Sequence, residues 1–215
     1  MHYTSVLFDL DGTLLDTLGD LTAAMNRTLT RHGLPERTRQ QMRAALGNGA
    51  RRLMELSVPA GTDGALFETL LAEYNADYAA HCRIETAPYP GVDALLRQLH
   101  AQGRKLAIVS NKPDEAVRAL RAEFFADTVP IAVGEKQGIR RKPAPDTLLT
   151  AMAQLGAERT STVYVGDSEV DIATARAAGL PCISVLWGFR DRDVLERAGA
   201  QQFASDAGEL ARLLD

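Results

Sequence analysis

The sequence has few of the residues that would place it in several large classes of protein. It holds 2 cysteines among 215 residues, too few for the disulfide framework of small secreted domains, so we expect Cys82 and Cys182 to be reduced thiols. No apolar run approaches the roughly 20 residues that a membrane-spanning helix needs. Residues 1–5 contain no basic segment leading into an apolar one, so we expect no secretion signal and a cytoplasmic location.

Positive charge is also scarce. The chain carries 24 lysines and arginines against 28 acidic residues, a formal net charge of -4, and its first lysine is Lys105. Without excess positive charge to neutralise a phosphate backbone or an anionic bilayer, we expect neither nucleic acid nor membrane as a partner. A hydrophobic content of 46% in a chain of this length is enough for a substantial core.

Short apolar runs alternate with helical segments over much of the chain. The runs lie at residues 5–8, 106–109, 129–133, 163–165 and 182–186. The helical segments between them lie at residues 92–102, 113–122, 145–155 and 171–178. Pro130 makes the third run the weakest, because proline removes a donor from the ladder of a sheet. The alternation predicts an α/β fold with a doubly wound, Rossmann-like parallel sheet that is covered on both faces.

A stretch with a different sequence pattern interrupts this alternation after its first strand. Apolar residues recur there with helical spacing, and no β-branched run of strand length is present. Breaks at residues 33–35, 47–49 and 58–61 divide the stretch into four expected helices. We therefore predict an α/β core made of residues 1–16 and 88–215, with residues 17–87 inserted as a helical cap.

Two carboxylates follow the first predicted strand. Asp9 and Asp11 stand at positions i and i+2 of an extended segment, so their side chains point the same way. Such carboxylates repel one another, and a bound divalent cation usually neutralises this repulsion. The carboxyl ends of the strands in an open α/β sheet are also where ligands bind. We expect a charged site at this edge.

Three further polar segments lie at or near the ends of later strands. Ser110 and Asn111 precede a predicted helix, where a hydroxyl and exposed backbone N–H groups can hold a phosphoryl oxygen. Lys142 lies in a segment whose prolines restrain the backbone. Asp167 and Asp171 add two carboxylates at the start of another predicted helix.

These segments, Asp-x-Asp-Gly-Thr, Ser-Asn, an isolated Lys and Gly-Asp-x-x-x-Asp, occur in the order of the four motifs of the haloacid dehalogenase-like superfamily of phosphohydrolases, which the chain closely resembles. The resemblance extends over essentially the whole chain, including the helical insertion. It implies hydrolysis of a small phosphomonoester. Asp9 would be the nucleophile that becomes an aspartyl phosphate, and Asp11 would protonate the leaving oxygen and then activate water.

The resemblance also implies how the substrate and a metal ion are held. Ser110 and Lys142 would bind the transferring phosphoryl group, with Asn111 beside them as a further substrate-binding residue. The expected cofactor is Mg²⁺.

Its expected ligands are the carboxylates of Asp9 and Asp167 and the main-chain carbonyl of Asp11. Asp171 would support these ligands from outside. Phosphoryl transfer depends mainly on positioning and charge neutralisation, which such a set supplies.

Residues that this sequence lacks exclude several enzyme types within the superfamily. The dehalogenases lack the second aspartate of the first motif, so Asp11 favours a phosphatase. The lack of lysine before Lys105 removes the cap lysine with which phosphonoacetaldehyde hydrolases form a Schiff base. Residues 17–30 contain no histidine of the kind that sugar phosphomutases place early in the cap, and His32 lies too late.

The remaining features most resemble phosphoglycolate phosphatases. They are the start Asp-Leu-Asp-Gly-Thr-Leu-Leu-Asp-Thr, the cap segment Gly47-Asn48-Gly49 and the segment from Ser110 to Pro113. The expected substrate is therefore 2-phosphoglycolate, and the expected partner of the chain is a small phosphorylated metabolite.

The cap offers one candidate for recognising a carboxylate. Asn48 and Arg51, or the neighbouring Arg52, are predicted to face the carboxylate end of the substrate, because arginine beside exposed N–H groups suits that anion. The competing interpretation is that these arginines belong to a solvated helix face.

Other functions stay open at this stage. A sugar phosphatase or a pyrophosphatase could share the same core, and a catalytically silent binding module could keep the fold. The complete set of motif residues argues against the silent module. The chain could be a monomer or a homodimer.

Overall fold

A computed structural model describes residues 3–215. The chain forms two compact units. One comprises the chain up to Asp16 together with Pro88–Asp215, and the other comprises Thr17–Ala87.

A six-stranded sheet organises the first unit. Its strands are β1 (Ser5–Phe8), β4 (Lys105–Pro113), β5 (Ile131–Glu135), β6 (Thr162–Gly166), β7 (Cys182–Val185) and β8 (Gln202–Ala204). They lie in the order β5-β4-β1-β6-β7-β8, and every neighbouring pair is parallel. The chain adds β4 and β5 on one side of β1 and then returns to add β6, β7 and β8 on the other. This arrangement confirms the predicted doubly wound sheet.

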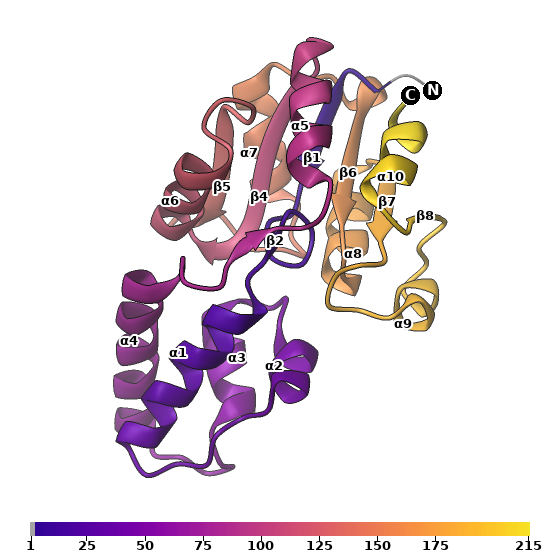
Figure 1. The fold of residues 1–215 in the computed structure, drawn as a ribbon. Helices are drawn as coiled ribbons and strands as arrows, with labels where there is room; N and C mark the ends of the chain where they lie inside the picture. The colour runs from indigo at the N-terminus through magenta and orange to yellow at the C-terminus, as the bar shows by residue number, and fades with distance from the viewer. Residues whose placement is uncertain (1–2) are drawn as a thin grey trace. The chain divides into compact units, whose positions relative to one another are not determined.

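Helices cover both faces of this sheet. They are α5 (Val92–Ala101), α6 (Asp114–Phe124), α7 (Asp146–Leu155), α8 (Glu169–Ala178), α9 (Arg192–Arg197) and α10 (Ala207–Leu214), with a 3₁₀ turn at Arg159–Ser161. Figure 1 shows α5 and α10 on the near face of the sheet and α7 and α8 on the far face. On the α7/α8 face, Leu7, Val109 and Tyr164 pack against Leu148 and Ala175. Burial on both faces explains why the strands are apolar throughout.

Two of the predicted strands have different bounds in the structure. The strand predicted at 129–133 begins at Ile131, because Pro130 cannot donate to the ladder. β4 runs beyond the predicted Val109 as far as Pro113, with a shift of register between these two residues. The irregular stretch carries Ser110, Asn111 and Lys112.

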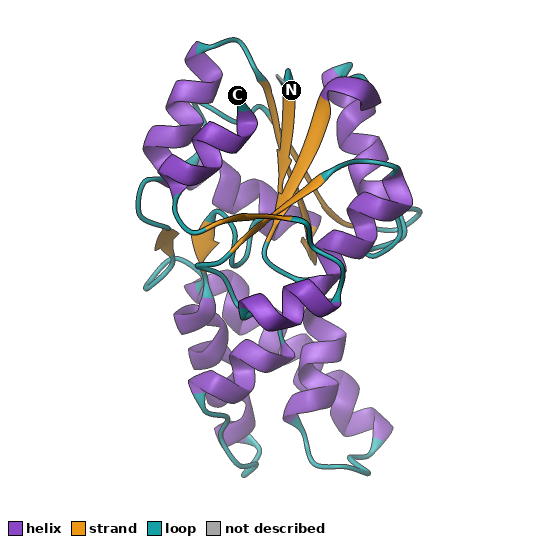
Figure 2. Ribbon diagram, turned by 90° about the vertical axis from the view of Figure 1, so that its right-hand side faces the viewer, coloured by secondary structure: helices purple, strands orange, loops and turns teal. Residues whose placement is uncertain are grey.

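The second unit is helical, with α1 (Leu18–Arg31), α2 (Arg39–Ala45), α3 (Gly49–Ser57) and α4 (Gly64–His81) separated at the three predicted breaks. Figure 2 shows helices in purple and the loops that join them in teal. α4 is joined to α1 by the buried Asp77, which accepts hydrogen bonds from Arg27 at 2.6 Å and Arg31 at 3.0 Å. Such a paired buried charge fixes the register of the two helices.

Two short strands mark the points where the chain leaves the first unit and returns to it. β2 (Leu15–Asp16) pairs with β3 (Ala87–Pro88). Just inside the helical unit, the Asp20 carboxylate accepts hydrogen bonds from the backbone N–H groups of Ile84, Glu85 and Thr86. This carboxylate holds the returning segment against the start of α1.

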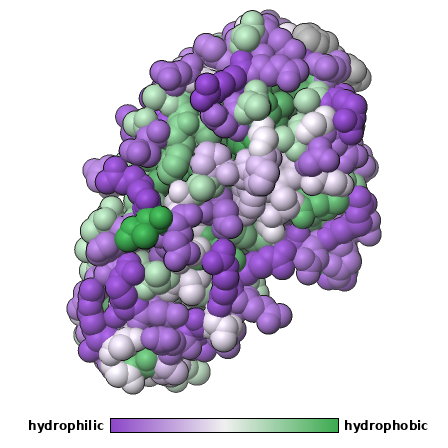
Figure 3. Space-filling view, in the orientation of Figure 1, coloured by the Kyte–Doolittle hydropathy of each residue, from purple (hydrophilic) through white to green (hydrophobic). Residues whose placement is uncertain are grey.

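The surface carries few large apolar side chains. Hydrophilic residues cover most of the face shown in Figure 3. Within residues 3–215, the large hydrophobic side chains classed as exposed are those of Leu56, Ile84 and Leu149. Over the same residues, no helix combines the length and the apolar character needed to cross a bilayer.

Candidate active site

The polar residues singled out in the core come together at the carboxyl ends of β1, β4 and β6, on both sides of the strand where the winding of the sheet reverses. Asp9 follows β1 directly, and its N–H donates to Val165 O at 2.9 Å, so it continues the ladder with β6. Ser110 lies in the irregular end of β4, and Asp167 follows β6. Open α/β sheets bind ligands at this switch point.

Lys142 is the central cation of the site. Its Nζ lies 2.8 Å from Asp9 Oδ1, 2.7 Å from Asp171 Oδ1 and 3.0 Å from the Tyr164 hydroxyl, and the side chain is 3% exposed. An ammonium group has three hydrogens, so these contacts use all of them. Burial lowers the pKa of Lys142, but the charges of Asp171 and Asp9 outweigh this effect and raise it. The lysine therefore stays charged.

Asn111 holds the main chain of Lys142. Its Oδ1 accepts from Lys142 N at 2.8 Å and its Nδ2 donates to Lys142 O at 3.0 Å. Both ends of the amide thus position the lysine. These contacts make Asn111 a support for Lys142, and its predicted contact with the substrate stays a prediction. The buried Ser110 Oγ accepts from Lys112 N at 3.2 Å.

Asp167 is held by two loop segments, one after β1 and one after β7. Its Oδ2 accepts from Phe189 N at 2.7 Å, and its Oδ1 accepts from the Thr13 hydroxyl at 3.4 Å. A Cβ added at Gly188 would lie 2.3 Å from Asp167 Cβ, so only glycine allows this approach. Burial, followed by the negative charge of Asp171, raises the pKa of Asp167 to about 7.

Asp171 is bonded through both of its oxygens. Oδ1 contacts Lys142 and accepts from the Tyr164 hydroxyl at 2.9 Å. Oδ2 accepts from Ser168 Oγ at 2.6 Å and Ser168 N at 3.1 Å at the start of α8. Burial alone would raise the pKa of Asp171, but the charge and hydrogen bond of Lys142 lower it below its usual value. Asp171 is therefore an ionised support inside the site.

The carboxylates of Asp9, Asp167 and Asp171 form a cluster in which one oxygen from each lies within 4.8 Å of the others. Burial raises the pKa of Asp9 well above its usual value, the charges of Asp171 and Asp167 add to this, and Lys142 opposes it. With all three ionised, Lys142 offsets one of three negative charges. Two remain, which match a divalent cation with a preference for oxygen ligands. Each Asp171 oxygen already has two close partners, whereas the contacts on Asp9 and Asp167 are fewer, so Asp9 and Asp167 are the side chains best placed to hold it.

Asp11 lies beside a second buried lysine. Lys112 Nζ is 3.2 Å from Asp11 Oδ1. No sequence pattern assigns a role to this lysine, although it directly follows Ser110 and Asn111. Tyr164 gives no signal in the sequence either, because a tyrosine inside an apolar strand is indistinguishable from a core residue until its hydroxyl is placed. Only the contacts identify both residues.

The cap residues proposed for the substrate carboxylate lie in the helical unit. Arg51 makes a two-pronged ion pair with Glu68, at 2.8 and 2.9 Å. Asn48 precedes α3 without a capping hydrogen bond from its side chain, and Arg52 pairs with Glu55 at 2.8 Å. Exposed ion pairs contribute about 0–1 kcal/mol, so a ligand could displace the Arg51 pair at little cost. The role of Asn48 and Arg51 stays a prediction.

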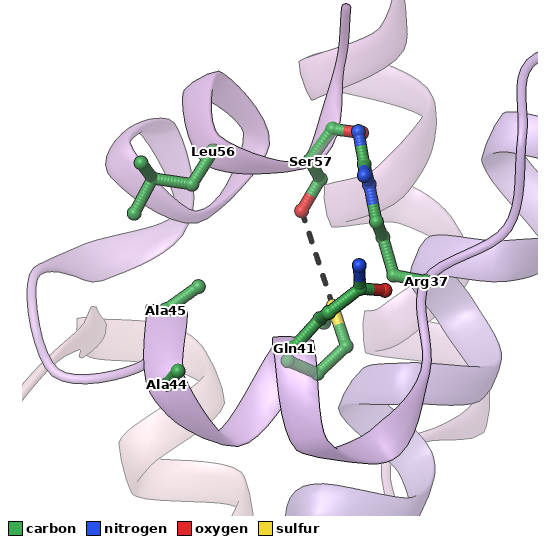
Figure 4. Close-up of a pocket in the computed structure, with 7 residues that line it drawn as sticks. Arg37, Gln41, Ala44, Ala45, Leu56 and Ser57 are labelled. Carbon is green, nitrogen blue, oxygen red and sulfur yellow. Dashed lines mark hydrogen bonds between the residues drawn. The ribbon is translucent and has the colours of Figure 1, made fainter.

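A cavity of about 340 Å³ lies within the helical unit, between α2 and α3 (Figure 4). Its lining residues are Arg37, Gln41, Met42, Ala44, Ala45, Leu56 and Ser57. The Arg37 guanidinium donates to Ser57 O at 2.7 Å, so its charge serves to join two segments of this unit. The cavity contains no carboxylate, and the chemistry of the motifs lies at the sheet edge.

Known proteins resemble this chain over most of its length. Residues 6–185 match the haloacid dehalogenase-like hydrolase family. A phosphoglycolate phosphatase of Xanthomonas campestris pv. campestris is 37% identical over 187 residues, which cover 86% of this chain and 84% of that protein. An N-acetylmuramic acid 6-phosphate phosphatase of Pseudomonas aeruginosa is 31% identical over 217 residues, which cover 100% of this chain and 96% of that one.

A solved structure agrees over the full length. A candidate phosphoglycolate phosphatase from Lactobacillus delbrueckii subsp. bulgaricus has a TM-score of 0.94 and 36% identity, and the match covers 100% of this chain and 99% of that chain. The fold, the four motifs at one sheet edge and these relatives lead to one conclusion: the chain belongs to the haloacid dehalogenase-like hydrolases and is a phosphoric monoester hydrolase.

Proposed function

We propose that this hydrolase uses Mg²⁺ to convert 2-phosphoglycolate to glycolate and phosphate. The observation that carries the reaction type is the cluster of Asp9, Asp167 and Asp171 around Lys142. Relatives named phosphoglycolate phosphatase, at 36–37% identity, support the substrate.

The residues divide the reaction into two displacements. In the first, an Asp9 oxygen attacks phosphorus, the bond from phosphorus to the ester oxygen breaks, and Asp11 gives its proton to the departing oxygen. In the second, Asp11 takes a proton from water, whose oxygen attacks phosphorus and releases phosphate and the Asp9 carboxylate. Asp9 and Asp167 would hold Mg²⁺, which would supply positive charge to offset the negative charge of the phosphoryl oxygens and of these carboxylates.

The remaining residues of the site position these groups. Lys142 holds Asp9 through Oδ1 and brings positive charge to the place where the phosphoryl group develops negative charge. Ser110, buried at the end of β4, is suited to donate to a phosphoryl oxygen. Asp171 keeps Lys142 charged and in place.

A sugar phosphate is the second candidate substrate. The relative named N-acetylmuramic acid 6-phosphate phosphatase is less identical but matches the whole chain. The sequence also left pyrophosphate open, because cap residues vary among members of the superfamily.

Phosphate release from a panel of substrates tests the proposal. The panel contains 2-phosphoglycolate, N-acetylmuramic acid 6-phosphate, glucose 6-phosphate and pyrophosphate, each assayed with Mg²⁺ and again after chelation. We expect the highest kcat/KM for 2-phosphoglycolate and loss of activity on chelation. A higher value for another substrate would refute the substrate assignment, and activity that survives chelation would refute the metal assignment.

Paired variants test the nucleophile. Asp9→Asn should abolish turnover while the protein remains folded. Asp93→Asn is the matched control, because Asp93 is a half-exposed residue of α5 that pairs with Arg97. Turnover in Asp9→Asn at a wild-type rate would exclude the aspartyl-phosphate mechanism.

A further inference from the structure

Lys112 is a buried cation for which the mechanism above has no use. Its side chain is 6% exposed, and its Nζ lies 3.2 Å from Asp11 Oδ1, whereas the Asp11 side chain is 20% exposed. Burying an ammonium group is costly unless an opposite charge compensates for it. Asp11 supplies that charge, so the two side chains form an ion pair.

The two lysines of the site have separate partners. Lys142 contacts Asp9, Asp171 and the Tyr164 hydroxyl, which lie around the phosphoryl position. Lys112 contacts Asp11, which acts on the leaving oxygen. The positive charge of Lys112 is therefore on the leaving-group side of the reaction.

The backbone around Lys112 is held firmly. Lys112 N donates to Ser110 Oγ at 3.2 Å. On the neighbouring strand, a Cβ added at Gly134 would lie 2.7 Å from Lys112 O, so β5 packs closely against this point. The sheet register resumes at once, with Pro113 opposite Glu135. A cation on such a base is preorganised, which favours selective recognition.

The geometry of the substrate connects this position to a carboxylate. In the phosphomonoester of a 2-hydroxy acid, the carboxylate is bonded to the same carbon as the ester oxygen, so its carbon lies only about 2.4 Å from that oxygen by ordinary bond lengths. An ammonium–carboxylate hydrogen bond adds about 2.8 Å. A cation that recognises this carboxylate must therefore lie close to the acid that protonates the ester oxygen. Lys112 lies beside that acid.

We propose that Lys112 binds the carboxylate of the leaving group and thereby selects phosphomonoesters of 2-hydroxy acids. The inference rests on the proposed function, which it deepens. In the absence of substrate, Asp11 is the counter-charge of Lys112. When substrate binds, the substrate carboxylate replaces Asp11 as the counter-charge of Lys112, which leaves Asp11 to carry the proton that it gives to the ester oxygen.

This assignment places carboxylate recognition in the α/β unit itself. The Arg51 guanidinium, the alternative cation, is exposed and already paired with Glu68 in the helical unit. Variants at the two positions therefore separate the two sources of specificity.

The experiment compares two esters that differ only in the carboxylate. The enzyme with Mg²⁺ is assayed on 2-phosphoglycolate and on ethyl phosphate, in which a methyl group replaces the carboxylate. The variants are Lys112→Met, which removes the charge, Lys112→Arg, which keeps it, and Arg51→Ala. Lys136→Met is the matched control, because Lys136 is a partly exposed lysine 4.0 Å from Asp114.

Lys112→Met should lower the ratio of kcat/KM for 2-phosphoglycolate to kcat/KM for ethyl phosphate by about tenfold to a hundredfold. This is the range for loss of a hydrogen bond to a charged group. Lys112→Arg should keep more of the preference than Lys112→Met, and Lys136→Met should keep all of it. Equal losses on both esters would mean that Lys112 only positions Asp11, and would overturn the inference. A ratio that falls only in Arg51→Ala would overturn it in favour of the cap.

Binding provides a readout without turnover. In an Asp9→Asn background, calorimetry should show that Lys112→Met weakens the binding of 2-phosphoglycolate by about tenfold or more. The binding of ethyl phosphate should weaken much less. Equal weakening again overturns the inference. If Lys112→Met does not fold, Lys112→Gln replaces it in both experiments. A wild-type enzyme that does not prefer 2-phosphoglycolate to ethyl phosphate would refute the proposed function and this inference together, whereas a wild-type preference that survives loss of Lys112 refutes the inference alone.

Discussion

Replacing Lys142 by methionine should destabilise the metal-free protein strongly and in a way that depends on pH. The substitution keeps a flexible, unbranched side chain of similar length but removes the ammonium group. That group contacts Asp9 at 2.8 Å, Asp171 at 2.7 Å and the Tyr164 hydroxyl at 3.0 Å, in surroundings that leave the side chain 3% exposed. The variant would therefore keep buried carboxylates without their cation.

The size of the effect follows from this burial. Removing one partner of a buried ion pair costs about 3–5 kcal/mol, because the remaining charge is left uncompensated. For a protein of this size, each kcal/mol lowers Tm by about 2–4 °C, so the expected loss is about 6–20 °C. The cost should be greatest near pH 8. At pH 5 it should be smaller, because Asp9 can protonate and remove one of the unpaired charges.

The assay is urea unfolding of wild-type protein and Lys142→Met at pH 5 and pH 8 in the presence of a chelator. Lys136→Met controls for the loss of a lysine with partial exposure. A free energy of unfolding within about 1 kcal/mol of the wild type at pH 8 would show that Lys142 does not compensate the carboxylates, since even exposed ion pairs contribute up to that amount. An equal loss at both pH values would refute the link to protonation of Asp9.

Four more predictions concern the same residues. The raised pKa of Asp167, about 7, means that its carboxyl destabilises the metal-free protein as the pH rises from about 4, where the carboxyl of the unfolded chain ionises, to 7. Mg²⁺ should therefore raise Tm more at pH 8 than at pH 5.5. The opposite order in thermal scans would contradict this prediction. Gly188→Ala should abolish turnover and lower Tm, because its Cβ would lie 2.3 Å from Asp167 Cβ. Normal phosphate release would contradict this close approach of Gly188 to Asp167. Asn111→Ala should lower kcat by up to about thirtyfold through displacement of Lys142, since it removes two hydrogen bonds worth about 1 kcal/mol each; an effect confined to KM would instead favour direct contact with substrate. Arg51→Ala should raise KM for carboxylated esters more than for ethyl phosphate if the cap contributes to specificity, and equal changes in steady-state kinetics would exclude it.

The sequence by itself determined the elements and the chemistry they carry. Apolar runs at 5–8 and 163–165 predicted strands of a parallel sheet, because burial on both faces removes the alternation of apolar and polar residues. The motif residues at the ends of these strands, such as Asp9 and Asp167, predicted a charged edge of the sheet. This inference is also local, because a strand that ends in polar residues ends at a surface or at a binding site. β8 escaped prediction because its three residues, Gln202–Ala204, form no apolar run.

Only the tertiary structure decided which of these residues touch. The placement of β1 between β4 and β6 brings Asp9 to Lys142, and the irregular end of β4 directs Asn111 to the Lys142 main chain and Lys112 to Asp11. No local pattern encodes these pairs, because they depend on strand order and on a register shift that arise when distant segments pack. Sequence therefore identified the reaction, and packing assigned the separate tasks of the two lysines.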